Sequence, residues 1–298
     1  MSIKPWIQAA RLRTLPLSVS GIIVGSAYAY YQGFSDWRIV VLALLTTLGL
    51  QVLSNYANDY GDGVKGTDAN RIGEKRLVAS GVITAEQMKK AVIITAILTF
   101  IIALLLIYVA FGKENFALSL IFILLGIGSI GAAIKYTVGK SAYGYSGFGD
   151  VFVFIFFGLV SVIGSNFLFT HFIDWKLFLP ATAIGLLSVA VLNLNNMRDI
   201  ENDKIAGKNT LVVKMGLKKA KIYHHFLIVL PFVLLFVFSI GINTRIFLSF
   251  FVFIFFLKHL EKVRKSTQYE DFDPELKKVA LGTFVLSLLF FISFTIEF

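Results

Sequence analysis

The chain has 298 residues, of which 57% are hydrophobic, 30 are Phe and none is Cys, and its net charge is +10. Charged residues make up only 15%, against roughly 25% in a soluble globular domain, and one core of this size cannot bury so much apolar surface. The composition therefore predicts a polytopic membrane protein. It excludes a disordered chain, a fibre and an ordinary cytosolic enzyme, and the absence of Cys excludes disulfides, thiolate metal sites and a cysteine nucleophile.

Nine segments with few or no charges predict membrane-spanning helices. A bilayer core about 30 Å thick needs about 20 apolar residues per helix. In chain order the segments are 14–35, 39–58, 91–112, 115–134, 151–173, 177–197, 222–244, 246–257 and 279–296. The eighth has only 12 charge-free residues and crosses only if Arg245 and Lys258 extend their charges to the two interfaces. The sequence therefore predicts one all-α transmembrane domain over residues 1–298, with nine helices or, failing the eighth segment, eight.

The first segment also has features of a secretory signal peptide. Basic residues precede it, and Ala27-Tyr-Ala29 has the pattern of a cleavage site. Its 22 charge-free residues are long for the apolar core of such a peptide, so we favour a retained helix.

The distribution of Lys and Arg predicts the orientation in the membrane. With nine helices and a cytoplasmic N-terminus, 24 of the 28 basic residues fall in cytoplasmic segments, as the positive-inside rule requires. The outer loops then hold only Arg38, Lys113, Lys176 and Arg245. We therefore expect a multi-pass protein of the cell (inner) membrane, with its C-terminus outside.

Two short acidic clusters follow the second and sixth predicted helices. The first consists of Asp59, Asp62 and Asp68, and the second of Asp199, Glu201 and Asp203. Both clusters fall on the predicted cytoplasmic side, where the longer and more highly charged loops also lie.

Helical spacing makes these clusters resemble a set of metal ligands. Asn58 and Asp62 share a helix face, as do Asn195, Asp199 and Asp203. Stacked carboxylates repel one another unless a cation lies between them, and oxygen-only ligands suit a hard ion such as Mg²⁺. A solvated helix end is the alternative for either cluster alone, but the repeated Asn-x-x-x-Asp pattern favours metal binding.

Basic residues are interleaved with the acids. They are Arg71, Lys75 and Arg76 after the first cluster, Arg198, Lys204 and Lys208 around the second, and Lys135 and Lys140 between them. Carboxylates with Arg and Lys suit a magnesium diphosphate, because Mg²⁺ usually keeps substrate phosphates in its coordination shell. The alternative explanation for individual lysines is that they follow the positive-inside rule or bind anionic lipid headgroups.

These segments resemble the UbiA superfamily of intramembrane prenyltransferases. The similarity lies in Asn58-Asp-Tyr-Gly-Asp62, Lys65-Gly-Thr-Asp68, Lys135-Tyr-Thr137 and Arg198-Asp-Ile-Glu-Asn-Asp203. Within the superfamily, the branch that prenylates 1,4-dihydroxy-2-naphthoate in menaquinone biosynthesis is most similar. Glu74, Val138 and Ser141 depart from the common pattern of that branch.

The resemblance implies a magnesium-dependent transferase with a cytoplasm-facing active site. It would transfer a polyprenyl chain from polyprenyl diphosphate to 1,4-dihydroxy-2-naphthoate, releasing CO₂ and diphosphate. The catalytic aspartates would be Asp62, Asp68, Asp199 and Asp203, which bind Mg²⁺ together with Asn58 and Asn195. The implied diphosphate contacts are Arg71, Arg76, Lys135 and Arg198, and weaker substrate contacts are Arg13, Tyr136 and Lys140.

Other activities remain as alternatives. Acceptors such as 4-hydroxybenzoate, a chlorophyllide, haem or a glycerol phosphate lipid would leave the metal clusters unchanged. A transporter fits less well, because transport sites generally lie near the bilayer midplane and these acids lie at one face. The expected partners are the two substrates and the lipid bilayer, with no nucleic acid.

A polyprenyl tail also needs an apolar slot between helices. Gly126, Gly128, Gly131, Gly158, Gly164 and Gly185 either leave room for such a slot or allow close helix packing, and the sequence does not separate these two uses.

Overall fold

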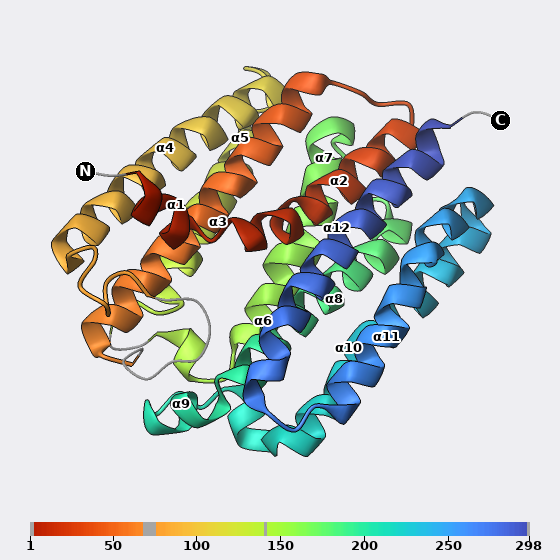
Figure 1. The fold of residues 1–298 in the computed structure, drawn as a ribbon. Helices are drawn as coiled ribbons and strands as arrows, with labels where there is room; N and C mark the ends of the chain where they lie inside the picture. Colours follow the sequence, from red (N-terminus) through yellow and green to blue (C-terminus); the bar gives the residue numbers. More distant parts are fainter. Residues whose placement is uncertain (1–2, 68–75, 140–141, 297–298) are drawn as a thin grey trace.

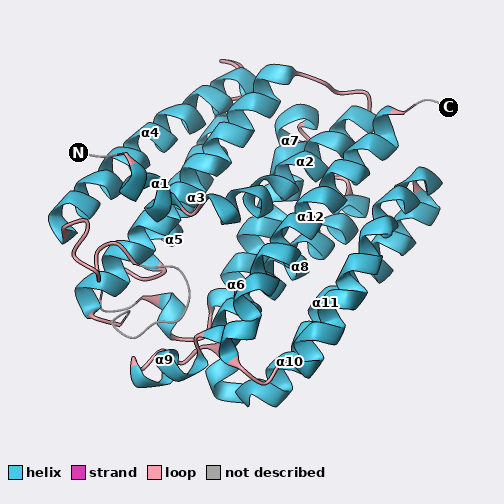
Figure 2. Ribbon diagram, in the orientation of Figure 1, coloured by secondary structure: helices cyan, strands magenta, loops and turns pink. Residues whose placement is uncertain are grey.

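The computed structural model describes residues 3–67, 76–139 and 142–296, and this part of the chain is helical throughout, with short connecting turns (Figures 1 and 2). The first half contains α1 (Lys4–Ala10), α2 (Leu15–Tyr31), α3 (Trp37–Lys65), α4 (Ala85–Phe111) and α5 (Phe116–Lys135). The second half contains α6 (Gly149–Val153), a π-helical segment (Phe154–Gly164), α7 (Ser165–Thr170), α8 (Phe178–Arg198), α9 (Ile200–Ile205), α10 (Leu211–Gly241), a 3₁₀ segment (Thr244–Val252), α11 (Phe253–Lys265) and α12 (Phe272–Thr295).

Seven helices within the described ranges are long and apolar enough to cross a membrane. They are Trp37–Lys65, Ala85–Phe111, Phe116–Lys135, Gly149–Thr170, Trp175–Arg198, Leu211–Gly241 and Tyr269–Thr295. The other two predicted spans are also helical: α2 has 17 residues, and the eighth is the 3₁₀ segment continued by α11. The all-α prediction is thus confirmed, whereas nine membrane crossings and their orientation stay predictions.

Local sequence signals account for several helix ends. Thr84 and Gln87 form a reciprocal capping box at the start of α4, which satisfies backbone groups that the first turn leaves open. Asp36 caps α3 by accepting a hydrogen bond from the backbone N–H of Arg38. Gly66 ends α3 in the left-handed region, at φ 72°, which glycine adopts without a steric penalty.

Helix α8 is the central helix of the bundle. It packs against α10, α12 and the π-helical segment, and its side chains, such as Leu187 and Leu194, are fully buried. In contrast, α5 has no buried residue and contacts mainly α3 and α4. The main core therefore surrounds α8, and α5 is a peripheral helix.

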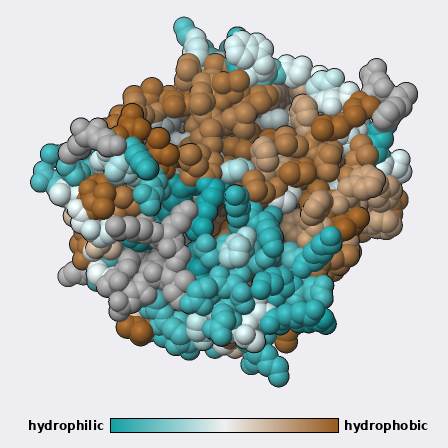
Figure 3. Space-filling view, viewed as in Figure 1, coloured by the Kyte–Doolittle hydropathy of each residue, from teal (hydrophilic) through white to brown (hydrophobic). Residues whose placement is uncertain are grey.

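Polar residues gather at one end of the molecule. In Figure 3 the upper part of the surface is apolar, and hydrophilic residues cover the lower part, where Figure 1 shows α9. The turn after α3 contacts α9 there, because the Asn202 side chain donates a hydrogen bond to the backbone oxygen of Thr67 at 2.9 Å. The described members of both acidic clusters consequently lie at the polar end of a largely apolar bundle.

Candidate active site

A cavity of about 980 Å³ lies between α2, α3, α5, the π-helical segment and α8. Its polar end is lined by five of the six predicted metal ligands: Asn58, Asp62, Asn195, Asp199 and Asp203. The sixth, Asp68, lies outside the described residues. The structure thus brings together side chains that are up to 145 positions apart in the sequence.

Helix geometry aims each group of ligands into the cavity. Asn58 and Asp62 lie one turn apart on α3. The helical course continues from α8 into α9, since the backbone N–H of Asp203 donates to the carbonyl of Asp199 at 2.8 Å. Asp62, Asp199 and Asp203 are only 2%, 4% and 5% exposed. The solvated helix end considered from the sequence does not match such burial.

Asp62 is surrounded by hydrogen-bond donors and positive charge. Lys208 Nζ lies 3.2 Å from its Oδ1 and Arg76 Nη2 lies 3.5 Å from its Oδ2, and the Tyr145 hydroxyl donates to Oδ1 at 2.7 Å. The Tyr145 ring also lies beneath the ammonium groups of Lys65 and Lys208, at 4.0 and 4.8 Å from its centroid, within cation–π range. Two of the residues on Asp62, Lys208 and Tyr145, were not among the predicted site residues.

Arg198 binds both carboxylate oxygens of Asp199. The guanidinium donates from Nε and Nη2 to the two carboxylate oxygens of Asp199, at 2.7 and 2.8 Å. Its Nη2 also donates to Asn195 Oδ1 at 2.8 Å, and its Nη1 donates to Asp273 Oδ1 at 2.5 Å. Arg198 is 1% exposed and thus connects two predicted metal ligands to a carboxylate on α12.

Asp59 belongs to the first acidic cluster but has a different environment. Its two carboxylate oxygens accept hydrogen bonds from the backbone N–H groups of Leu77 and Val78, at 3.1 and 3.0 Å. Asp59 therefore fastens the turn that carries Arg76, and the neighbouring Asp62 faces the cavity.

The remaining predicted site residues are distributed as follows. Arg13, Arg76, Tyr136 and Arg198 line the main cavity. Lys135 is exposed and lines a second cavity of about 580 Å³ instead, and Arg71 and Lys140 lie outside the described residues. Burial, followed by the nearby Asp150 carboxylate, raises the pKa of Tyr136, so this phenol stays neutral at pH 7 and can donate a hydrogen bond.

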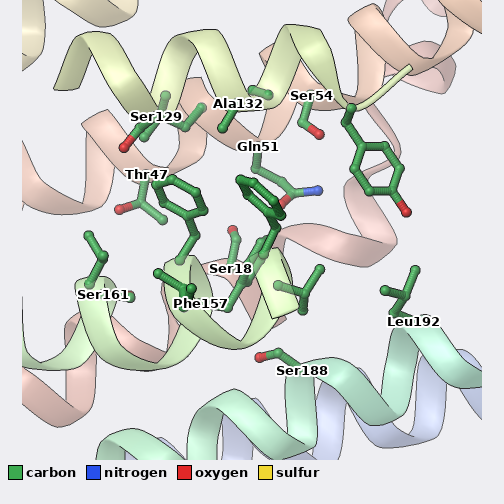
Figure 4. A pocket seen from close by; sticks show the side chains of 18 of the residues that line it. Ser18, Thr47, Gln51, Ser54, Ser129, Ala132, Phe157, Ser161, Ser188 and Leu192 are labelled. Carbon is green, nitrogen blue, oxygen red and sulfur yellow. The ribbon is translucent and has the colours of Figure 1, made fainter. Parts of the chain in front are cut away.

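The cavity changes character away from its polar end. Figure 4 shows Ser18, Thr47, Gln51 and Ser161 around an interior that also contains Phe157. Further along, apolar side chains of α4, α5 and the π-helical segment line the cavity, including Leu106, Leu118 and Phe156. An amphipathic ligand with a charged head and a long apolar tail suits this shape.

The glycines divide between the two uses left open by the sequence. A Cβ on Gly158 would lie 2.7 Å from Gly185 Cα, so this pair allows the π-helical segment to approach α8. A Cβ on Gly126, Gly128 or Gly131 would meet nothing within 4 Å, and these α5 glycines line the two cavities. The second cavity shares Phe152 and Phe156 with the first, so the apolar space extends along α5.

The donor set at the polar end fits Mg²⁺ bound together with a ligand. Its five described members offer only carboxylate and amide oxygens, the donors that Mg²⁺ prefers. Within residues 3–67, 76–139 and 142–296, no three His, Asp or Glu side chains gather closely enough to hold a metal ion by themselves. Oxygens from a bound phosphate would complete the coordination, as is usual for Mg²⁺.

Comparison with known proteins identifies the family of this chain. The model of the UbiA prenyltransferase family matches residues 18–294. The 1,4-dihydroxy-2-naphthoate octaprenyltransferase of Escherichia coli is 43% identical, over 96% of this chain and 93% of that protein. The protein with the same description in Haemophilus influenzae is 42% identical, over 97% and 94%.

Solved structures share the fold at low sequence identity. A UbiA homolog from Archaeoglobus fulgidus superposes with a TM-score of 0.68 at 14% identity, covering 98% of this chain and 99% of that one. The same homolog bound to DMAPP and Mg²⁺ has a TM-score of 0.64 at 16% identity, covering 95% and 96%.

Proposed function

Because the chain belongs to the UbiA prenyltransferase family, we propose that it transfers a polyprenyl chain from polyprenyl diphosphate to 1,4-dihydroxy-2-naphthoate. The transfer releases diphosphate and CO₂ and forms demethylmenaquinol, a step of menaquinone biosynthesis. The observation that carries this proposal is identity of 42–43% over nearly the whole chain to two octaprenyltransferases of this acceptor. The cavity, with buried carboxylates at one end and apolar walls beyond, has the polarity that a prenyl diphosphate requires.

Two groups of side chains bind Mg²⁺ in this proposal. Asn58, Asp62 and Asp68 form the first group, and Asn195, Asp199 and Asp203 form the second. When bound, Mg²⁺ would offset the negative charge that grows on the leaving diphosphate. The homolog structure bound to DMAPP and Mg²⁺ supports this choice of metal.

Basic side chains hold the diphosphate and stabilise its departure. Arg76 and Lys208 form ion pairs with the Asp62 carboxylate. Both are therefore within reach of a diphosphate bound beside that carboxylate. Cations already in place stabilise developing charge without reorganisation in the transition state. Arg71, Lys135 and Arg198 remain predicted contacts, and Lys135 would have to turn from the neighbouring cavity.

The walls of the cavity position the tail and the acceptor. Apolar side chains along α5 and the π-helical segment bind the prenyl tail and exclude water from the allylic carbon. Aromatic rings such as those of Phe156 and Phe157 can face a developing allylic cation. Arg13, Tyr136 and Lys140 are the proposed contacts for the carboxylate and hydroxyl groups of the acceptor.

We place the polar end of the bundle at the cytoplasmic face of the cell membrane. The nine predicted spans, a cytoplasmic N-terminus and an outer C-terminus put 24 of 28 basic residues on that side. The active site then opens toward the water-soluble acceptor, and the tail stays in the bilayer.

The direct test uses the purified protein in nanodiscs with prenyl diphosphates of several lengths. We expect product from 1,4-dihydroxy-2-naphthoate, none from 4-hydroxybenzoate, and loss of activity with EDTA that excess Mg²⁺ restores. Transfer to 4-hydroxybenzoate instead would assign a different acceptor. Unchanged turnover in EDTA would contradict the metal requirement.

A further inference from the structure

Asp273, at the start of α12, contacts the arginine that binds the second group of proposed metal ligands. It contacts Arg198 Nη1 at 2.5 Å and Arg13 Nη1 at 3.3 Å, so it joins segments that are 260 positions apart. Leu276 and Lys277 line the main cavity, but Asp273 does not. Asp273 therefore acts on the site through the two arginines and not by touching a ligand.

We propose that Asp273 is a positioning residue that fixes the plane of the Arg198 guanidinium and, through it, the metal-binding orientation of Asp199 and Asn195. This inference rests on the proposed function. It assigns a role in that site to a residue 70 positions beyond the second acidic cluster, which no sequence pattern indicated.

The rigid geometry of a guanidinium transmits this effect. Arg198 donates hydrogen bonds from Nε and Nη2 to Asp199, from Nη2 to Asn195 and from Nη1 to Asp273. Because the group is planar and its donors form a fixed fork, the position of Nη1 determines where Nε and Nη2 lie. Asp273 thus sets the direction from which Asp199 and Asn195 are held.

Burial makes the contact with Asp273 important. Arg198 is 1% exposed and Asp199 is 4% exposed, so a donor released from Asp273 has little access to water. Replacing the carboxylate by a neutral amide removes a charge-assisted hydrogen bond, which is about twice as strong as a neutral one, and we expect the guanidinium to rotate toward another acceptor. That rotation releases Asp199 or Asn195 from its present orientation.

The test measures metal binding directly, with Mn²⁺ as a paramagnetic substitute for Mg²⁺. The full-length protein in detergent, with inorganic diphosphate present, is titrated with Mn²⁺ and free Mn²⁺ is measured by electron paramagnetic resonance. Loss of a residue that orients a metal ligand typically costs 10- to 100-fold in metal affinity. We expect Asp273→Asn to raise the half-saturating Mn²⁺ concentration by about 10- to 100-fold, and Asp273→Glu, which keeps the carboxylate, to raise it less.

Asp271→Asn is the matched control. Asp271 lies two residues away and pairs with Lys262 at the surface, at 3.1 Å, so its removal should leave Mn²⁺ binding unchanged. An equal effect of both variants would overturn the proposal. So would wild-type Mn²⁺ affinity in Asp273→Asn or, if that variant does not fold, in Asp273→Ser, which also lacks the carboxylate.

Two kinetic measurements separate positioning from a general charge effect. Removing a negative charge beside two arginines would by itself lower the KM for prenyl diphosphate, whereas loss of positioning lowers kcat and raises the Mg²⁺ requirement. Since Asp273 acts through Arg198, its substitution should add little in an Arg198→Lys background. Full additivity would overturn the proposal.

The Mn²⁺ titration also separates this inference from the proposed function. If the wild-type protein binds Mn²⁺ with diphosphate but transfers no prenyl group to any acceptor, the proposed function fails. The effect of Asp273→Asn on metal binding can still be measured in that case.

Discussion

Asp59 and Asp62 are three residues apart on α3 but serve different purposes. Asp59 accepts two backbone hydrogen bonds from the turn at residues 77–78, and Asp62 faces the cavity with Lys208, Arg76 and Tyr145 around it. Asp62 is therefore the proposed metal ligand and Asp59 a structural residue. The two can be separated by measuring stability and turnover independently.

We expect Asp62→Asn to abolish prenyl transfer without lowering the Tm, because it removes one charged ligand and keeps the shape of the side chain. Asp59→Ala should instead lower the Tm, because the buried N–H of Leu77 and the half-buried N–H of Val78 then lack this acceptor, and a buried unpaired group costs about 1–3 kcal/mol. Turnover assays and thermal unfolding in the same detergent check both. Near-normal turnover of Asp62→Asn at saturating Mg²⁺ would exclude Asp62 as a ligand.

Lys208 shows how position distinguishes one lysine from another. Its Nζ lies 3.2 Å from Asp62 and 4.8 Å from the centroid of the Tyr145 ring, whereas Lys218 is exposed on α10 and does not line the cavity. Of these two lysines, Lys208 is the one placed to contact a bound diphosphate.

Lys208→Ala should lower kcat by on the order of 10²-fold or more, judged by the loss of one donor that stabilises transition-state charge. Lys218→Ala, the matched control, should change kcat little. Steady-state transfer with varied prenyl diphosphate at fixed Mg²⁺ measures both. Equal damage from the two substitutions would show that a general surface charge, and not a contact at the site, is responsible.

At the scale of elements, two glycines determine how closely the π-helical segment packs on α8. A Cβ on Gly158 would lie 2.7 Å from both the Ala181 carbonyl oxygen and Gly185 Cα. These are backbone atoms and cannot move aside as a side chain can. Because α8 carries Asn195 and is followed directly by Asp199, the packing of this pair also places the polar end of the cavity.

We expect Gly158→Ala to destabilise the protein by about 1–3 kcal/mol through overpacking. Gly128→Ala on α5 is the control, because a Cβ there would meet nothing within 4 Å and alanine favours a helix more than glycine does. Thermal unfolding should show a lower Tm for Gly158→Ala only. A comparable loss of Tm in both variants would contradict the assignment of α5 to a peripheral, loosely packed position.

The whole molecule separates into an apolar body and one polar end (Figure 3). The described members of both acidic clusters gather at that end, together with Arg76, Arg198 and Lys208. This separation fits an enzyme that binds a charged headgroup at a membrane surface and a tail within the bilayer. It does not fit a transport site near the bilayer midplane.

Reporter fusions test the orientation of the whole molecule. We expect fusions after Gly33, Lys113 and the C-terminus to report from outside the membrane, and fusions within 204–219 to report from the cytoplasm, because that arrangement keeps most basic residues inside. An inside report from the C-terminus would reduce the nine predicted crossings to an even number.

The sequence by itself determined the helical class and the positions of the long apolar helices, and it singled out most of the polar side chains that line one end of the cavity. These features depend on local composition and on spacing along one helix, such as Asn195, Asp199 and Asp203 on successive turns, and both can be read without knowing any neighbour. Lys208 is one of the basic residues around the second acidic cluster, so a signal for it existed in the sequence.

Only the tertiary structure decided which residues meet across the bundle. Asp273 reaches Arg198 because α12 packs beside α8. Tyr145 reaches Asp62 near the end of α3. In the core, His224 Nε2 lies 2.7 Å from His259 Nε2. The opposite uses of Gly158 and Gly128 were likewise undetermined by the sequence, since a glycine is the same residue in a tight contact and beside a cavity. Such pairings depend on how whole helices pack, and helix packing is set by the summed fit of many side chains and not by any one segment.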